Sequence, residues 1–328
     1  MKLLSIAVGV FLTGLVGTGA VASPALVSPV QYQNRAAFRL SDGITEAIVV
    51  PSLGRVMRYG FVGGRNWLWN STAKDGDPGS FSGWHNWGGE KTWLAPQSEW
   101  PVWHSPGWPP DPAIDGTPYT AVLLPGGRLR TTGNVSSGTG CRIVRDYSFD
   151  PDGSFAVAQM VEKITGPPLH VSIWSVTQVD PPATILLSLN PDSPYRDNWF
   201  TFAGQPVATV FPARPQAMLL EIRPSSHGNY KVGADSPVAV IVAVQDGIAL
   251  RLRAAKPSGD YPDGAGSHGF PTEVYDSGTT QSHYVELELL SPFRIYVPGS
   301  RFTTTVHWSL HKLTAGDPDA AARLLTAP

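Results

Sequence analysis

The chain has 328 residues, a formal net charge of -2 and only 15% charged side chains. With so little positive charge it has no basic stripe to neutralise phosphates, which argues against nucleic acid and anionic membrane surfaces as partners. Its single cysteine, Cys141, cannot form a disulfide within the chain. The packed core alone must therefore stabilise the folded protein.

Residues 1–22 have the pattern of a secretory signal peptide. Lys2 precedes an apolar run that begins at Leu3, and the segment ends on small residues, Ala20-Val21-Ala22. A charged head, a short apolar region and an A-x-A ending are typical of signal peptides. The run is interrupted by glycines and is shorter than the roughly 20 apolar residues that a membrane span needs. We therefore expect a secreted or periplasmic protein, cleaved near Ala22, with no membrane insertion after signal removal.

The remaining chain, residues 23–328, is punctuated throughout by turn-forming residues. The sequence holds 34 glycines and 31 prolines, spread evenly rather than gathered in a linker. Many short strands joined by turns produce this pattern, so we predict an all-β fold. The clearest early strands are predicted over residues 45–50, 119–124, 155–161, 170–179 and 238–244.

Eight of the eleven tryptophans fall between residues 66 and 119, among Gly, Pro, Asn, His, Asp and Glu rather than aliphatic residues. They are Trp67, Trp69, Trp84, Trp87, Trp93, Trp100, Trp103 and Trp108. Indole faces suit the apolar C–H face of a sugar ring, while polar groups satisfy its hydroxyls. The cluster therefore indicates a carbohydrate surface. A long loop held by tryptophan anchors, or a protein interface, is the alternative.

The stretch from residue 87 to residue 100 is densest in functional residue types. The candidate substrate-binding residues in it are Trp87, Glu90, Lys91, Trp93, Glu99 and Trp100. Glu90 and Lys91 are adjacent, either as an ion pair in a cleft or as a solvated pair. His85 and His104 match no zinc-binding spacing, so we predict no metal site. The sequence has no phosphate-binding or dinucleotide-binding loop, and we predict no cofactor.

The C-terminal third shows the strongest strand pattern. Residues 283–290 alternate with period 2, which places Glu286 and Glu288 on one face and aliphatic residues on the other. Two further strands are predicted over 293–297 and 302–310, and a helix over 318–325. The two glutamates either face solvent on an edge strand or form a pair in a cleft, where like charge raises one pKa. The expected architecture is two large packed antiparallel sheets, with loops carrying the site.

Four segments together resemble the galactose mutarotase-like superfamily. Residues 50–57 resemble its early Gly-Arg strand and residues 285–310 its closing strands. Residues 88–96 and 174–178 resemble its DUF4380 branch. The likeness runs roughly from residue 35 to 315. It implies one β-supersandwich domain over 23–328, with a sugar bound on the concave face of the large sheet.

The resemblance also implies site residues. Mutarotation needs a base at the anomeric hydroxyl and an acid at the ring oxygen. Glu288 matches the family's base, with Glu286 second, and Arg55 lies near its substrate-binding arginine. The strand that offers the family's acid, a histidine, instead carries Trp174 and Gln178, which become candidate sugar-binding residues.

Three functions follow from this reading. The first is an exported protein that binds a mono- or oligosaccharide in an aromatic cleft. The second is a sugar-processing enzyme, either similar to aldose 1-epimerase with Glu288 as base, or a lyase or hydrolase. The third is a structural or partner-binding protein of the cell envelope.

Overall fold

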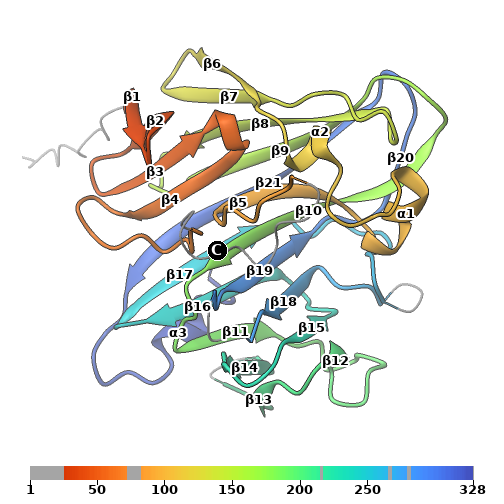
Figure 1. The fold of residues 1–328 in the computed structure, drawn as a ribbon. Coiled ribbons are helices and arrows are strands. Elements are labelled where there is room, and N and C mark those ends of the chain that lie inside the picture. The colour runs from red at the N-terminus through yellow and green to blue at the C-terminus, as the bar shows by residue number, and fades with distance from the viewer. Residues whose placement is uncertain (1–25, 72–82, 215–216, 265–267, 279–281, 328) are drawn as a thin grey trace, which may run out of the picture.

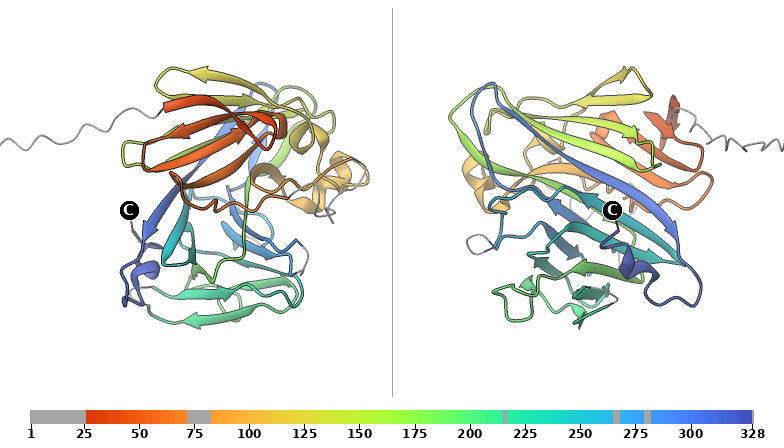
Figure 2. Two further views of the ribbon diagram at one scale, coloured as in Figure 1. Left: turned by 60° about the vertical axis from the view of Figure 1, so that its left-hand side comes forward. Right: turned by 180° about the vertical axis from the view of Figure 1, so that it is seen from behind.

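Two antiparallel sheets account for nearly all the regular structure in this computed structural model, which describes residues 26–71, 83–214, 217–264, 268–278 and 282–327. The predicted signal peptide lies outside these residues. In Figure 1 the strands of both sheets follow one another from the top of the molecule to the bottom, and Figure 2 shows the two sheets as layers. The predicted all-β architecture of two packed sheets is confirmed.

The first sheet contains eleven strands. In spatial order they are β1 (Leu26–Tyr32), β2 (Arg35–Ser41), β3 (Thr45–Val50), β4 (Arg55–Phe61), β5 (Glu90–Ala95), β10 (Leu169–Val179), β19 (Val285–Leu290), β18 (Thr272–Asp276), β15 (Tyr230–Ala234) and β12 (Phe200–Ala203), with β20 (Arg294–Tyr296) pairing to β10.

The second sheet contains ten strands. They are β13 (Val207–Phe211), β14 (Leu219–Arg223), β11 (Thr184–Ser188), β16 (Ala239–Gln245), β17 (Ile248–Ala254), β21 (Arg301–Lys312), β9 (Phe155–Lys163), β8 (Cys141–Phe149), β7 (Arg128–Thr132) and β6 (Thr120–Leu124). The early and C-terminal strands predicted from the sequence all occur within a few residues of their expected bounds.

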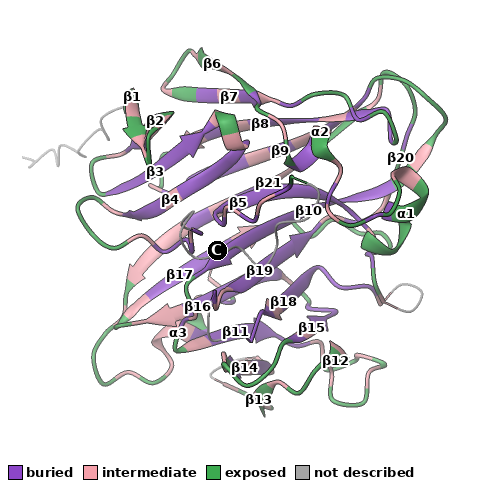
Figure 3. Cartoon of the chain, viewed as in Figure 1, coloured by how far each residue is buried: buried purple, intermediate pink, exposed green. Residues whose placement is uncertain are grey.

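The main hydrophobic core lies between the two sheets, built from alternate residues of their strands. Tyr59 of β4 shows how the layers interlock, because its ring packs against Phe155 of β9 and its hydroxyl donates to the carbonyl of Trp308 in β21 at 3.0 Å. The central strands are buried along their length, as the purple ribbon in Figure 3 shows.

Strand β19 is central, not an edge. It pairs with β10 on one side and β18 on the other, and all six of its residues are buried. Val285 and Leu287 point into the core between the sheets, so Glu286 and Glu288 project from the opposite face. The predicted alternation is confirmed, and the alternative of a solvent-facing edge strand is wrong.

Helical structure in the described residues is confined to short turns. These are η1 (Pro51–Leu53), η2 (Gln97–Glu99), α1 (Trp100–Trp103), α2 (Pro112–Asp115) and α3 (Ala320–Arg323). The helix predicted over 318–325 shrinks to the single turn of α3, which packs Ala322 against the outer face of the second sheet. None of the helices in the described ranges has the length and apolar character needed to cross a bilayer.

Candidate functional site

A cavity of about 400 Å³ lies over the face of the first sheet that points away from the core. It is lined by Trp84, Asn86, Trp93, Gln97, Trp108, Trp174, Gln178, Phe202, Ala203, Lys231, Tyr275, Tyr284, Glu286 and Glu288. The volume falls within the range of about 300–1,000 Å³ that small-molecule sites occupy. Its lining combines many aromatic rings with a few polar groups, as such sites generally do.

Charged side chains from neighbouring strands meet on the cavity floor. Antiparallel pairing sets Glu288 of β19 directly opposite Glu273 of β18. Lys231 reaches over from β15, and its Nζ lies 2.6 Å from Oε2 of Glu273 and 3.0 Å from Oε2 of Glu288. One ammonium is therefore shared by two buried carboxylates.

Side chains from β10 and β5, on the other side of the cavity floor from Lys231, hold Glu286. Gln178 of β10, its cross-strand partner, donates from Nε2 to Oε1 of Glu286 at 2.8 Å. The Nζ of Lys91, on β5, lies 3.5 Å from the same oxygen. Trp174 donates from Nε1 to Oε2 of Glu288 at 2.8 Å, so the first sheet itself fixes both glutamates.

Burial of the cavity floor shifts the pKa values of several of its charged groups. Burial raises the pKa of Glu286, and repulsion from Glu288 adds to this while Lys91 opposes it. Burial also raises the pKa of Glu273 well above its usual range, against the attraction of Lys231. For Lys91, burial outweighs the attraction of Glu286 and lowers the pKa to about 8. Burial disfavours the charged form of Lys231, but its two carboxylate partners prevail and raise its pKa.

Tryptophan rings form one wall of the cavity. The centroids of Trp93 and Trp174 lie 5.2 Å apart, and Trp108 packs parallel to Trp100 at 6.1 Å. Trp108 is 38% exposed, which makes its ring an accessible part of this wall. Of the predicted tryptophan cluster, Trp84, Trp93 and Trp108 therefore line the cavity, whereas Trp67 lies in the core between the sheets.

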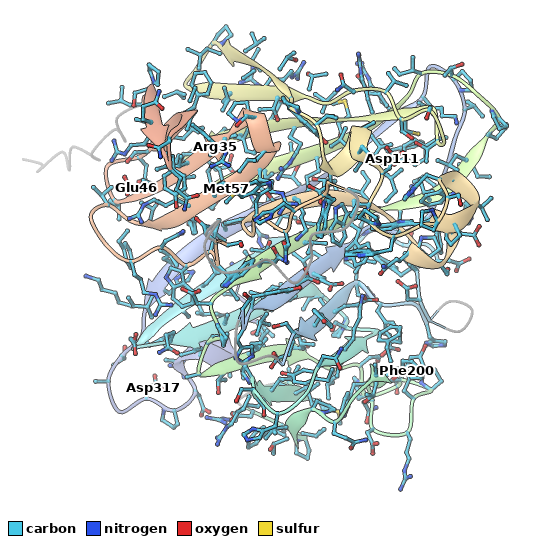
Figure 4. The ribbon with its side chains drawn as sticks, in the orientation of Figure 1. Arg35, Glu46, Met57, Asp111, Phe200 and Asp317 are labelled. Atoms are coloured by element: carbon cyan, nitrogen blue, oxygen red, sulfur yellow. The ribbon has the colours of Figure 1, made fainter. Side chains whose placement is uncertain are left out.

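Asp115, at the end of α2, fixes this wall. Its carboxylate accepts hydrogen bonds from Nε1 of Trp93 at 3.0 Å and from Nε1 of Trp84 at 3.3 Å. Arg55 donates to its two oxygens at 2.6 and 2.8 Å. Helix α2 is started by Asp111, labelled in Figure 4, whose side chain accepts from the backbone N–H of Ala113.

The structure brings together six of the residues predicted for the site. Trp93, Trp174, Gln178, Glu286 and Glu288 line the cavity, and Lys91 lies against Glu286. They come from β5, β10 and β19, three adjacent strands of one sheet.

The other predicted residues lie elsewhere. Arg55 is buried beneath the wall as the partner of Asp115, and Trp100 supports the wall from behind. The ring of Trp87 lies tilted against that of His85 and beneath the guanidinium of Arg35, outside the cavity. Glu99 is exposed.

Glu90 points away from the cavity, into the space between the sheets, where it forms a buried ion pair with Arg145 of β8. Neighbouring residues on a strand face opposite sides, so Glu90 and Lys91 cannot both line one cavity. Both alternatives considered from the sequence, an ion pair in a cleft and a solvated pair, are therefore wrong, because both side chains are buried and each has its own partner across the fold.

Sequence reasoning missed Lys231, Glu273 and Asp115, together with the cavity residues Phe202, Tyr275 and Tyr284. Three of these carried a local signal: Glu273 and Tyr275 share one face of a short strand-like segment bounded by Pro271 and Gly278, and Tyr284 shares the face of Glu286 in the alternation over 283–290. The others reach the site through strand pairing or loop packing across long sequence distances.

Among the described residues, no histidine lines the cavity. His307 and His283 instead contact Asp150 and Asp276. The described residues contain no group of three or more His, Cys, Asp or Glu side chains arranged to hold a metal ion. Cys141 is buried away from the cavity.

No protein-family model matches the sequence, and no curated protein matches it either. Solved structures match its fold. A protein named "putative aldose 1-epimerase" from Klebsiella pneumoniae aligns with a TM-score of 0.56 at 12% identity, over 89% of this chain and 82% of that one. Galactose mutarotase-like proteins from Clostridium acetobutylicum and Lactobacillus casei give TM-scores of 0.53 and 0.52, at 8% and 10% identity. The alignments cover 88% and 87% of this chain, and 99% and 100% of those proteins. The chain therefore has the galactose mutarotase-like β-sandwich fold.

Proposed function

We propose that this protein is exported and binds a carbohydrate in the cavity over β10 and β19. The observation that carries the proposal is the composition of the cavity: tryptophan and tyrosine rings surround a floor of fixed carboxylate, amide and ammonium groups. A sugar ring needs both, because its C–H face packs on aromatic rings and its hydroxyls need donors and acceptors at the edge. The structural neighbours, named for mutarotases and an aldose 1-epimerase, support a sugar as the ligand class.

A second candidate is sugar processing with Glu288 as base. One observation favours it: two carboxyl groups, Glu286 and Glu288, lie on the cavity floor beside an amine, Lys91, whose pKa is about 8. An amine with this pKa can exchange a proton near neutral pH, as general acid–base catalysis requires. Binding remains the first proposal, because the described part of the cavity lacks the histidine that the resemblance leads one to expect.

The test compares two tryptophan variants by calorimetric titration with mono- and disaccharides. Trp108→Ala removes an accessible ring of the cavity wall, whereas Trp87→Ala removes a half-buried ring of the same segment outside it. We expect Trp108→Ala to weaken sugar binding about tenfold, the effect of losing one stacking contact worth about 1.4 kcal/mol. Trp87→Ala should bind as the wild type does. Equal affinities for both variants would contradict the proposed position of the sugar.

A further inference from the structure

The cavity has an uneven charge balance. Its lining contains two carboxylates, Glu286 and Glu288, and a single ammonium, Lys231. Behind the lining, Lys91 lies against Glu286, and Glu273, whose pKa burial raises, shares Lys231 with Glu288. The surface that a ligand meets therefore holds two carboxylates and one ammonium. The buried pairs next to the floor do not change this balance, because Arg55–Asp115 and Arg145–Glu90 are each neutral.

The hydrogen bonds show which carboxylate oxygen of the floor lacks a partner. Lys231 is shared between Glu273 and Glu288, and within the described chain no donor reaches Oε1 of Glu288 although that residue is fully buried. Glu286 is the carboxylate that keeps a surface toward the cavity, with its side chain 11% exposed. A ligand that enters the cavity therefore meets an accessible carboxylate backed by a second, incompletely paired one.

The aromatic rings of the cavity favour a positively charged ligand. The Nζ atoms of Lys91 and Lys231 each lie 4.7 Å from an indole centroid, over Trp93 and Trp174. Ring faces attract cations, and the floor already uses this attraction for the chain's own ammonium groups. No arginine lines the cavity in the described residues, and arginine is the usual partner of carboxylate and phosphate groups.

We propose that the ligand is a sugar that carries a free, positively charged amino group, held by Glu286. This inference rests on the proposed function and narrows its ligand class. Sugar phosphates and uronic acids are repelled by the two carboxylates of the lining and bind poorly. Neutral sugars fit the cavity but form no charge pair with Glu286.

The test is an NMR titration of the wild-type protein at pH 7 with glucosamine, N-acetylglucosamine, glucose and glucuronate. N-acetylglucosamine is the matched ligand, since acetylation removes the charge and leaves the ring unchanged. We expect glucosamine to bind about tenfold more tightly than the two neutral sugars, as one partly desolvated charge pair provides. Glucuronate should bind more weakly than glucose.

Two variants distinguish the effect of the Glu286 charge from the effect of the protein's net charge. Glu286→Gln should abolish the preference for glucosamine, whereas Glu99→Gln, which removes an exposed charge outside the cavity, should leave it unchanged. Equal binding of glucosamine and glucose, or tighter binding of glucuronate, would overturn this inference while leaving sugar binding intact. Binding of none of the four sugars would overturn both. The comparison of the four sugars uses the wild-type protein, so it tests the preference for a charged amino group even where a variant does not fold.

Discussion

Asp115 should be essential to the stability of the cavity wall. It is 4% exposed and it neutralises Arg55, which is 1% exposed, while accepting two indole N–H bonds. Removing one partner of a buried ion pair costs about 3–5 kcal/mol, because the other charge stays buried without compensation. Each indole N–H left without an acceptor costs roughly 1 kcal/mol more.

We therefore expect Asp115→Asn to lower the free energy of unfolding by about 3 kcal/mol, since its amide oxygen still accepts from the indoles while Arg55 loses its counter-charge. Asp115→Ala should lower it by about 5 kcal/mol. The double variant Arg55→Met/Asp115→Leu should recover the part of the loss caused by the unpaired charge, because two apolar side chains need no counter-charge. A loss of about 2 kcal/mol should remain, because the indole N–H groups of Trp93 and Trp84 still lack their acceptor.

The assay is urea unfolding followed by far-ultraviolet circular dichroism, with near-ultraviolet spectra reporting the packing of the tryptophans. Asp146→Ala is the control, since Asp146 pairs with Arg130 at a partly exposed position, where an ion pair contributes about 1 kcal/mol or less. The reasoning is refuted if both single Asp115 variants unfold within 1 kcal/mol of the wild type, the loss expected only of an exposed pair.

Three further predictions concern other parts of the fold. Burial raises the pKa of Glu273, so its carboxyl takes up a proton on folding, and this contribution to stability is lost as the pH rises through the folded-state pKa. Glu273→Gln should thus raise the free energy of unfolding more at pH 7.5 than at pH 4.5 in urea titrations; a larger gain at pH 4.5 would contradict the assignment. Gly89→Ala should cost more than the roughly 1–3 kcal/mol of a left-handed backbone alone, because its Cβ would lie 2.3 Å from the carbonyl oxygen of Val56. Gly126→Ala, left-handed but in open space, is the control, and an equal loss in the two variants would refute the clash. Burial raises the pKa of the Cys141 thiol, so Ellman's reagent at pH 8 should react at least about tenfold more slowly with native than with denatured protein; similar rates would show that the thiol is accessible.

Local patterns explain which parts of the fold were predictable. The strand over residues 45–50 depends on β-forming residues between nearby turns, and the alternation over 285–290 depends on side-chain period, so the sequence itself specifies them. The helix over 318–325 was predicted too long, because an alanine-rich segment forms only as much helix as tertiary packing supports.

The charge network was not predictable in the same way. Lys231 and Glu288 are 57 residues apart, and they meet because β15, β18 and β19 are neighbours in one sheet. No local pattern reports which strands will pair. Asp115 lies on a single helical turn in a loop, so nothing in its own surroundings in the sequence identifies it as the partner of Arg55.

Adjacent residues illustrate the same limit. Glu90 and Lys91 look like a pair in the sequence, but a strand sends them to opposite faces, where each finds a separate partner. Reading that segment as a strand would have separated them. Identifying Arg145 and Glu286 as their partners requires the order of strands in both sheets.

The most direct test of the central claim is saturation-transfer proton NMR on the wild-type protein with a panel of neutral and amino sugars. The protein should transfer saturation to the C–H protons of at least one sugar, since a bound sugar would pack its C–H face on the tryptophan rings of the cavity. Interconversion of the α and β anomers should proceed at its uncatalysed rate if the protein only binds, and faster if Glu288 acts as a base. Absence of saturation transfer across the whole panel would contradict a sugar-binding cavity.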